Sequence, residues 1–498
     1  MGSGIHAYLW HHYRLSYLSQ TAEEKTFFGD ITFRGQARFG AVVVVFSPLY
    51  KSRQRIYRVH LGVSMSFSES WCPMPQFLDS FIVQARLHRE HMRDQLARGR
   101  EGPLDQELKM MLRRVWQPLD EQIQNESDVI AVDGSRAIRP FGTGAFLYVV
   151  RALALHGSQR FREIEVDSFI SRCKKEEINT FIERTMELME FKAALQAVES
   201  NEVKRGAFLL IDGSLYGRMM ALPRDMPIEG RRATMLEYME SYSKLLKACR
   251  RRGVTLLGVS KDSRACFIRD YFLDQMMNEE LRNLSSRVES RDIERLKSLL
   301  EESNGEGRSQ TVFENLKAKY PLFLDRAATI FEEYLSARPD HQMILRFCDE
   351  PGYTCALCHR PPLNKIRQIT PARRNPEAYV EQNFKGALKE AMDKESFIER
   401  AVKTLKDVVE FPAVISFHVL LDLRDTPLRI DTPSWSIDID QSLFDVKRSE
   451  LIDADLCDVI NMLRSGYGGL RNYNIWLKKV DQEVRLRRDV VDELYCSM

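Results

Sequence analysis

Alternating apolar and polar stretches divide the N-terminal part of the chain into segments with different predicted structure. From Phe27 to Phe67, β-branched and aromatic runs separated by Gly, Pro and Ser predict an antiparallel β segment. Apolar residues at helical spacing over 77–97 and 104–124 predict two amphipathic helices. We therefore expect a β-rich and helical N-terminal region over residues 1–125.

Three short apolar runs follow this region, and each of them ends at a polar motif. VIAV precedes Asp133, FLLI precedes Asp212 and TLLGVS precedes Lys261, which is the pattern of strands that are buried in a sheet. The segments 176–199 and 235–251 between them have helical periodicity. This alternation of strands and helices predicts an α/β core, whose first part we place at 126–274.

The rest of the chain is first helical and then again strand-forming. Residues 275–347 and 383–409 are charged and helical in pattern, and we take 275–409 as a helical insertion. The stretches FPAVISFHVLLDL and PLRIDTP then predict a pair of strands, and a helix is expected after Gly466-Tyr467. We assign 410–498 to the C-terminal part of the core.

Composition and charge limit the possible environments and partners. With 73 Lys plus Arg against 71 Asp plus Glu, the net charge is only +2, so attraction to a polyanion has to come from local patches or from a partner protein. The longest aliphatic run, 41–46, is too short to span a bilayer, and no export signal is apparent. The nine cysteines lack the dense spacing of a disulfide scaffold. We expect a cytoplasmic location.

The two Asp-Gly-Ser motifs at 133–135 and 212–214 are the strongest chemical signal. A single motif of this kind is most often a turn or a helix cap. If the two strands are neighbours, however, Asp133 and Asp212 converge at one edge of the sheet, where carboxylates repel each other unless a cation lies between them. Hard oxygen ligands favour Mg²⁺ or Mn²⁺, and paired ions of this type cleave phosphodiesters. This chemistry indicates a nucleic-acid backbone as substrate.

In these motifs the chain resembles the NurA nucleases. VIAVDGSR is similar to the first aspartate motif of that family, FLLIDGSLYG to the second, and GVSKDSRA to the lysine motif that follows. The resemblance implies an RNase-H-like mixed sheet with flanking helices, and a metal-dependent nuclease that acts on DNA. It includes neither the region before about residue 126 nor the helical insertion.

The resemblance also implies which residues form the site. The metal ligands would be Asp133, Asp212, a helical glutamate and His418, with Mn²⁺ or Mg²⁺ as cofactor. Glu190 fits the family pattern for the glutamate better than its alternative, which is Glu187. Lys261 and Arg136 would contact the DNA backbone, and Lys261 would also stabilise the transition state.

The C-terminal part departs from the family pattern in two respects. Gly468 follows Tyr467 where the family usually has proline, and Tyr473-Asn474 stands in the segment where an Ala-His pair is usual. The family tyrosine upstream of the histidine has no counterpart beside Glu410 and Phe411. These differences leave open an alternative function, a catalytically weak or inactive subunit that assembles with partners or clamps DNA.

The expected partners also follow from the resemblance. They are a second copy of this chain and a HerA-type hexameric ATPase, acting on DNA ends in resection, repair or defence against phages. The sequence contains no P-loop pattern, so ATP-driven movement has to be supplied by another chain. An RNase-H-like enzyme that acts on RNA is a third possibility, which substrate choice would distinguish.

A Cys-x-x-Cys-His pattern at 355–359 requires a separate interpretation. It matches a haem-attachment pattern, but that chemistry belongs to exported proteins. Together with Cys348 the cluster could hold zinc, yet a second well-spaced pair is missing. Ordinary reduced cysteines are the favoured interpretation.

Overall fold

The computed structural model describes residues 16–17, 25–29, 42–51, 54–62, 77–88, 101–119, 127–261, 263–302, 307–336, 338–470, 472–487 and 493. The chain divides into two compact units, residues 1–89 and 90–498. In the first unit, an antiparallel sheet contains β1 (Ser16–Tyr17), β2 (Lys25–Gly29), β3 (Val42–Lys51) and β4 (Gln54–Gly62), and a helix α1 (Phe77–Leu87) follows. The antiparallel β segment predicted here is confirmed for the described residues.

The second unit is built on an 11-stranded mixed sheet. Nine of its strands follow the order β15-β12-β13-β14-β10-β9-β6-β7-β8, while β11 pairs with β13 and with β5. The strands are β5 (Trp116–Pro118), β6 (Val129–Pro140), β7 (Ala145–His156), β8 (Gln159–Ile170), β9 (Phe208–Asp212), β10 (Thr255–Ser260), β11 (Gly352–Thr354), β12 (Ala356–Cys358), β13 (Val414–Leu420), β14 (Leu428–Pro433) and β15 (Glu450–Ile452).

The part of the sheet from β8 to β10 has RNase-H-like topology, as predicted. β6, β7 and β8 form an antiparallel meander, and the chain then returns through a helix to place β9 parallel to β6. A second helical crossover places β10 parallel to β9. Parallel neighbours need such crossovers because their connection has to run the length of the sheet.

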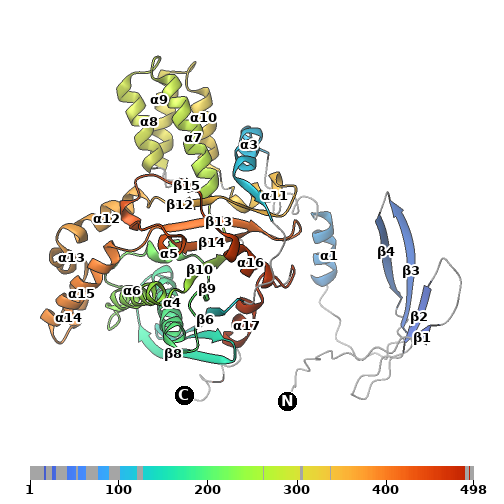
Figure 1. Ribbon diagram of the computed structural model, residues 1–498, viewed down its shortest axis with the longest axis horizontal. Helices are drawn as coiled ribbons and strands as arrows, with labels where there is room; N and C mark the ends of the chain where they lie inside the picture. Colours follow the sequence, from blue (N-terminus) through green and yellow to red (C-terminus); the bar gives the residue numbers. More distant parts are fainter. Residues whose placement is uncertain are drawn as a thin grey trace. The chain divides into compact units, whose positions relative to one another are not determined.

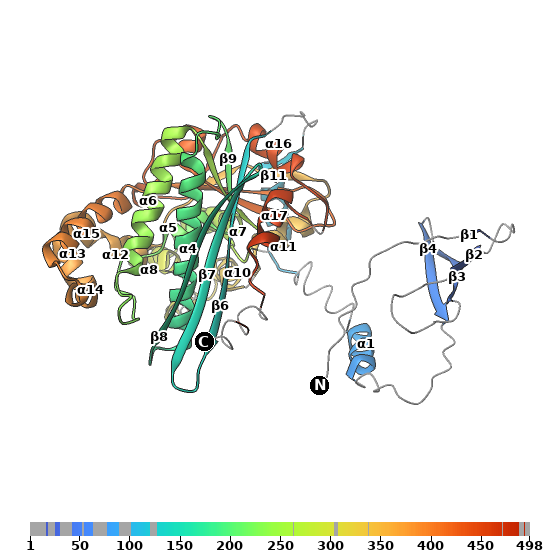
Figure 2. The same cartoon turned by 90° about the horizontal axis from the view of Figure 1, so that it is seen from below.

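Helices cover both faces of this core, as Figure 2 shows. On one face, α4 (Lys175–Glu199) and α6 (Thr234–Arg252) pack against Val132 and Ile211. On the other face, α16 (Cys457–Ser465) and α17 (Ile475–Val484) pack against Ala131 and Leu210. The VIAV and FLLI runs are therefore apolar throughout because both of their faces are buried.

The remaining helices form two groups that project from the sheet (Figure 1). One group has its own apolar core and contains α7 (Phe267–Leu284), α8 (Ser290–Glu302), α9 (Gly307–Lys319) and α10 (Asp325–Leu335). The other group contains α12 (Leu363–Arg374), α13 (Pro376–Asn383), α14 (Lys385–Glu390) and α15 (Lys394–Val409). The other helices of this unit are α3 (Asp105–Val115), α5 (Leu215–Met219) and α11 (Asp340–Phe347).

The structure refines the interpretation of the segment predicted to be a helical insertion. The segment 275–409, predicted as a helical insertion, also contributes β11 and β12 to the main sheet. Among the described residues, no helix has the length and apolar character needed to cross a membrane.

Candidate active site

Asp133 and Asp212 lie at equivalent positions on two adjacent parallel strands. Val132 of β6 pairs with Ile211 of β9. The next residue of each strand is an aspartate, so Asp133 and Asp212 lie opposite each other in the same register. Side chains at paired positions of parallel strands point to the same face of a sheet. The two carboxylates therefore lie side by side on one face of the sheet, as the motif pair predicted, but only Asp212 ends its strand, because β6 continues past Asp133 to Pro140.

The glycines of the two motifs make room for this arrangement. Gly213 has a φ of 101°, a conformation that other residues rarely adopt, and the chain turns there directly after Asp212. At Gly134, a Cβ atom would lie 2.5 Å from Oε1 of Glu190. Only glycine lets the glutamate of α4 come this close to the strand that carries Asp133.

The two candidate glutamates of α4 have different surroundings. Glu190 is 2% exposed and reaches the backbone beside Asp133. Glu187 lies one turn earlier, where its carboxylate accepts hydrogen bonds from Arg184 at 2.5 Å and from the Tyr238 hydroxyl at 3.0 Å. The structure thus places Glu190, and not Glu187, next to the first aspartate.

Arg218, which the sequence analysis missed, holds the second aspartate and the glutamate together. It lies on α5, is only 5% exposed, and its Nη2 donates a hydrogen bond of 3.0 Å to the main-chain oxygen of Asp212. Its Nη1 lies 2.6 Å from Oε2 of Glu190, an ion pair without the angle of a hydrogen bond. No motif marked it, because its charged partner Glu190 lies on a different helix.

Helix α17 brings two further residues to the aspartates. Asn474 caps this helix by accepting hydrogen bonds from the main-chain N–H groups of residues 476 and 477, and the preceding Tyr473 donates a hydrogen bond of 3.4 Å to Oδ1 of Asp212. Asp481 is four residues after the buried Leu477 and three before the buried Val484, so it lies on the face that packs on the sheet. Its charge acts on both aspartates.

The acidic groups of this site raise one another's pKa values. Burial raises the pKa of Asp133 to about 8, with further contributions from Glu190, Asp212 and Asp481. Burial also raises the pKa of Glu190 to about 7, although Arg218 opposes the shift. Asp212 is exposed by surface area, yet the surrounding protein raises its pKa while Arg218 lowers it. When its carboxyl groups ionise, the cluster therefore carries more negative charge than the single positive charge of the buried Arg218 can neutralise.

Comparison with known families assigns the part of the chain that contains these residues. Residues 127–355 match the NurA domain family. The match includes Asp133, Glu190, Asp212 and Lys261, whereas Tyr473 and Asp481 lie beyond it.

Solved structures of NurA proteins are similar to the chain over most of its length. One is the crystal structure of the NurA nuclease from Sulfolobus solfataricus, with 14% identity, covering 85% of this chain and 97% of that chain at a TM-score of 0.46. Another is a crystal structure of NurA bound to dAMP and manganese, with 14% identity, covering 83% and 94% at a TM-score of 0.34. A search of curated protein sequences gives no match.

Lys261 reaches the second aspartate through Tyr473. It follows β10, and its Nζ is 3.0 Å from Oδ1 of Asp425 and 5.5 Å from the centre of the Tyr473 ring. Since the same tyrosine contacts Asp212, the lysine is one residue removed from that carboxylate. It is partly exposed, as a group that contacts a substrate has to be.

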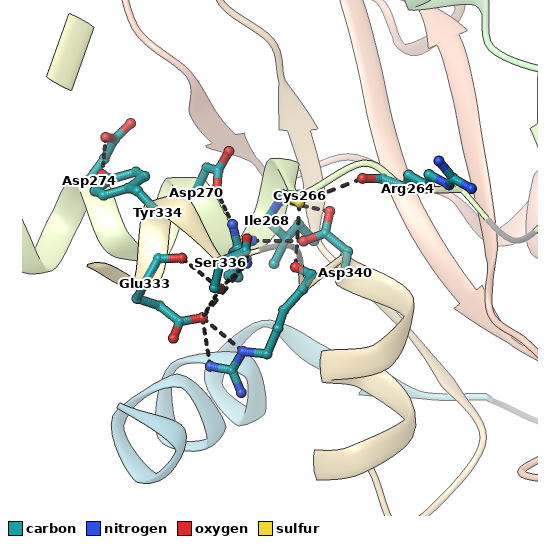
Figure 3. Close-up of polar contacts among 11 residues, drawn as sticks. Arg264, Cys266, Ile268, Asp270, Asp274, Glu333, Tyr334, Ser336 and Asp340 are labelled. Carbon is teal, nitrogen blue, oxygen red and sulfur yellow. Dashed lines mark hydrogen bonds and ion pairs between the residues drawn. The ribbon is translucent and has the colours of Figure 1, made fainter. Parts of the chain in front are cut away.

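The structure does not bring His418 into this cluster. It lies on β13, three strands from β9, which at about 4.8 Å per strand is roughly 14 Å from Asp212. Its side chain is 3% exposed and its Nε2 is 3.8 Å from Asp340. Asp340 in turn accepts hydrogen bonds from the first main-chain N–H groups of α7 (Figure 3). The sequence analysis assigned His418 from its place in the order of the motifs. That order does not show which strands are neighbours in the sheet.

Two other residues that the sequence analysis considered, one as a DNA contact and one as a zinc ligand, have partners within the protein. Arg136 pairs with Glu183 of α4 at 2.7 Å, so its guanidinium is directed along that helix. His359 is buried and lies 2.6 Å from the hydroxyl of Ser416, which does not fit a zinc ligand. Within the described parts of the chain, no three His, Cys, Asp or Glu side chains are placed as they stand to hold a metal ion.

The acidic cluster nevertheless has the donor set of a divalent-cation site. Carboxylate oxygens of Asp133 and Asp212 come from equivalent positions of adjacent strands, and Asp481 acts on them from α17. Their raised pKa values come in part from mutual repulsion, which a divalent cation would relieve. Hard oxygen donors of this kind suit Mg²⁺ or Mn²⁺.

We expect the two glutamates to behave differently when each is replaced by its neutral isostere. Glu190→Gln should lower Mn²⁺-dependent cleavage by about 100-fold, the upper end of what loss of a group around a metal site costs. Glu187→Gln is the matched control on the same helix and should stay within about fivefold of wild type, since its hydrogen bonds come from Arg184 and Tyr238 and its carboxylate lies 3.7 Å from Arg218, against 2.6 Å for that of Glu190. Steady-state cleavage of labelled DNA measures both. The opposite ranking would identify Glu187 as the functional glutamate.

Proposed function

We propose that the chain is a divalent-metal-dependent DNA nuclease. The observation that carries this proposal is the pair Asp133 and Asp212 at equivalent positions of adjacent parallel strands, with Glu190 packed against Gly134 beside Asp133. The NurA domain over 127–355 supports the same conclusion. Repelling carboxylates at an accessible edge stabilise nothing by themselves, so their presence favours a catalytic role.

In this proposal Asp133, Glu190 and Asp212 hold the metal, and Asp481 is a fourth candidate. When bound, Mg²⁺ or Mn²⁺ would stabilise the attacking and leaving oxygens of the phosphodiester. Arg218 keeps Glu190 and the backbone of Asp212 in place, and the Tyr473 hydroxyl orients the Asp212 carboxylate. Lys261 offsets the negative charge that develops on the phosphate as the bond breaks. His418 has no part in this set.

The test is cleavage of end-labelled linear DNA by the full chain with Mn²⁺, with Mg²⁺ and with EDTA. We expect fragments with either metal and none with EDTA. An RNA of the same sequence, run in parallel, should be cleaved much more slowly. Metal-dependent cleavage of RNA alone would favour the RNA-processing alternative. DNA binding without any cleavage would favour an assembly or clamping subunit.

We further propose that this nuclease works as a homodimer with a HerA-type hexameric ATPase, in DNA end resection, repair or phage defence. The net charge of +2 leaves the chain little non-specific affinity for DNA, so a translocating partner would keep the substrate engaged. Co-expression with such an ATPase should yield a complex in size-exclusion chromatography. ATP should then raise degradation of long DNA by about tenfold or more through tethering. Two separate elution peaks and no effect of ATP would contradict this partnership.

A further inference from the structure

A buried ion pair on β14 contacts the turns that follow β9 and β10, and the proposed mechanism has not used it. Arg429 is 4% exposed and Asp431 is fully buried, and Nε of the arginine lies 3.0 Å from Oδ1 of the aspartate. They are two residues apart on one strand, so both side chains lie on the same face of the sheet. An isolated buried charge is costly, but here each charge has its counter-charge and further hydrogen bonds.

Asp431 contacts the turn that follows the second catalytic aspartate. Its Oδ2 accepts hydrogen bonds from the Ser214 hydroxyl at 2.7 Å and from the main-chain N–H of Tyr216 at 3.2 Å. The Ser214 hydroxyl also accepts a hydrogen bond from the main-chain N–H of Gly217, which caps α5. Asp431 therefore fixes both the start and the direction of the short helix that carries Arg218.

Arg429 contacts the turn after the neighbouring strand. Its Nη1 donates a hydrogen bond of 3.0 Å to the hydroxyl of Ser263, two residues after Lys261. β14 lies beside β10 in the sheet, with Arg429 opposite Ser260 and Asp431 opposite Gly258. One ion pair thus contacts both turns from the same strand.

We propose that the Arg429–Asp431 pair is a positioning device for the nuclease site, which sets the turn at Ser214 and the turn at Ser263 relative to each other. Through Ser214 it holds α5, so that Arg218 stays on Glu190 and on the main-chain oxygen of Asp212. Through Ser263 it holds the segment that presents Lys261. The inference rests on the proposed nuclease function. Arg429 and Asp431 act only through the two turns, and neither of them touches the substrate.

A second hydroxyl that binds Asp431 provides a matched control. Ser416 of β13 donates a hydrogen bond of 2.7 Å to Oδ1 of Asp431 and also lies beside His359. It is as buried as the pair itself, and it contacts neither turn. Removing the Ser416 hydroxyl takes from Asp431 a hydrogen bond as long as the one from Ser214. The contacts that hold the start of α5 remain in place.

The experiment compares Ser214→Ala, Ser263→Ala and Ser416→Ala in Mn²⁺-dependent cleavage and in thermal unfolding. Each should lower Tm by roughly 2–4 °C, the size expected for one lost buried hydrogen bond in a chain of this size. Only Ser214→Ala and Ser263→Ala should lower kcat, by about 10- to 100-fold, because small displacements of reacting groups have effects of this size. KM for DNA should stay within about threefold, and Ser214→Thr, which keeps the hydroxyl, should restore most of the rate.

Two outcomes would overturn the inference. One is a kcat within twofold of wild type for both turn variants, and the other is an equal loss of kcat in Ser416→Ala. Asp133→Asn in the same assay separates these results from failure of the proposed function, since wild type and Asp133→Asn would then be equally inactive. If Ser214→Ala does not fold, Ser263→Ala tests the other side of the pair independently.

Discussion

Asp133→Asn is expected to lower Mn²⁺-dependent DNA cleavage by about 10³-fold while making the metal-free protein more stable at pH 8. The asparagine keeps the shape of the side chain but cannot supply an anionic ligand, and loss of one electrostatic contributor at a reacting centre has effects of this size. Stability should rise because the wild-type carboxyl has to ionise where it is largely buried and close to Glu190, Asp212 and Asp481.

The sign of the stability effect follows from the pKa of Asp133. The folded state raises this pKa from 3.8 to about 8, so ionisation is easier in the unfolded chain. Ionisation of Asp133 therefore lowers the stability of wild type as pH rises from about 4 to about 8, and Asp133→Asn avoids this contribution while keeping those of Glu190 and Asp212. One pKa unit corresponds to about 1.4 kcal/mol, and discounting for solvent at the edge of the sheet leaves about 1–3 kcal/mol at pH 8.

Thermal unfolding in EDTA at pH 5 and pH 8 measures this difference, with cleavage measured separately in Mn²⁺. The control is Glu202→Gln, an exposed carboxyl in the loop before β9, whose Tm should follow that of wild type at both pH values. Full cleavage by Asp133→Asn would refute the metal-site proposal. A stability gain of the same size at both pH values would refute the electrostatic explanation.

The strands that carry the aspartates could be predicted because burial on both faces leaves an uninterrupted apolar run. VIAV and FLLI form β6 and β9, and their parallel pairing brings Asp133 and Asp212 together as expected. The hairpin of β7 and β8 was missed, although the two residues Gly157-Ser158 join its strands. β8 alternates exposed and half-buried residues along its whole length, a usable signal.

The rest of the site depends on contacts that no local pattern encodes. The family pattern favoured Glu190 over Glu187, but the physical reason, the space that Gly134 leaves beside the first aspartate, is visible only in the structure. Arg218, Tyr473 and Asp481 come from α5 and α17, and only the packing of these helices on the sheet brings them to the carboxylates. The error at His418 has the same origin, since the position of β13 in the sheet follows from strand pairing.

Arg218→Met is expected to destabilise the folded chain by about 3–5 kcal/mol at pH 8.5, the usual effect of removing one partner from a buried ion pair. The methionine fills a similar volume but leaves the buried Glu190 carboxylate without its counter-charge and the main-chain oxygen of Asp212 without its donor. Cleavage should fall as well, because both groups belong to the proposed metal site.

The loss caused by Arg218→Met should shrink as pH falls. The pKa of Glu190 is about 7 even with Arg218 present, and without the arginine it rises further, so the carboxyl becomes protonated and needs no counter-charge. Arg218 therefore stabilises the fold most above pH 7 and progressively less towards pH 5.5. Denaturant unfolding at these pH values measures the difference.

In Arg218→Met/Glu190→Gln, where no carboxylate remains at 190, the pH dependence should largely disappear and part of the stability should return. If the single variant loses the same free energy at pH 5.5 and 8.5, Arg218 acts through packing or through Asp212, and the charge balance inferred for Glu190 is wrong.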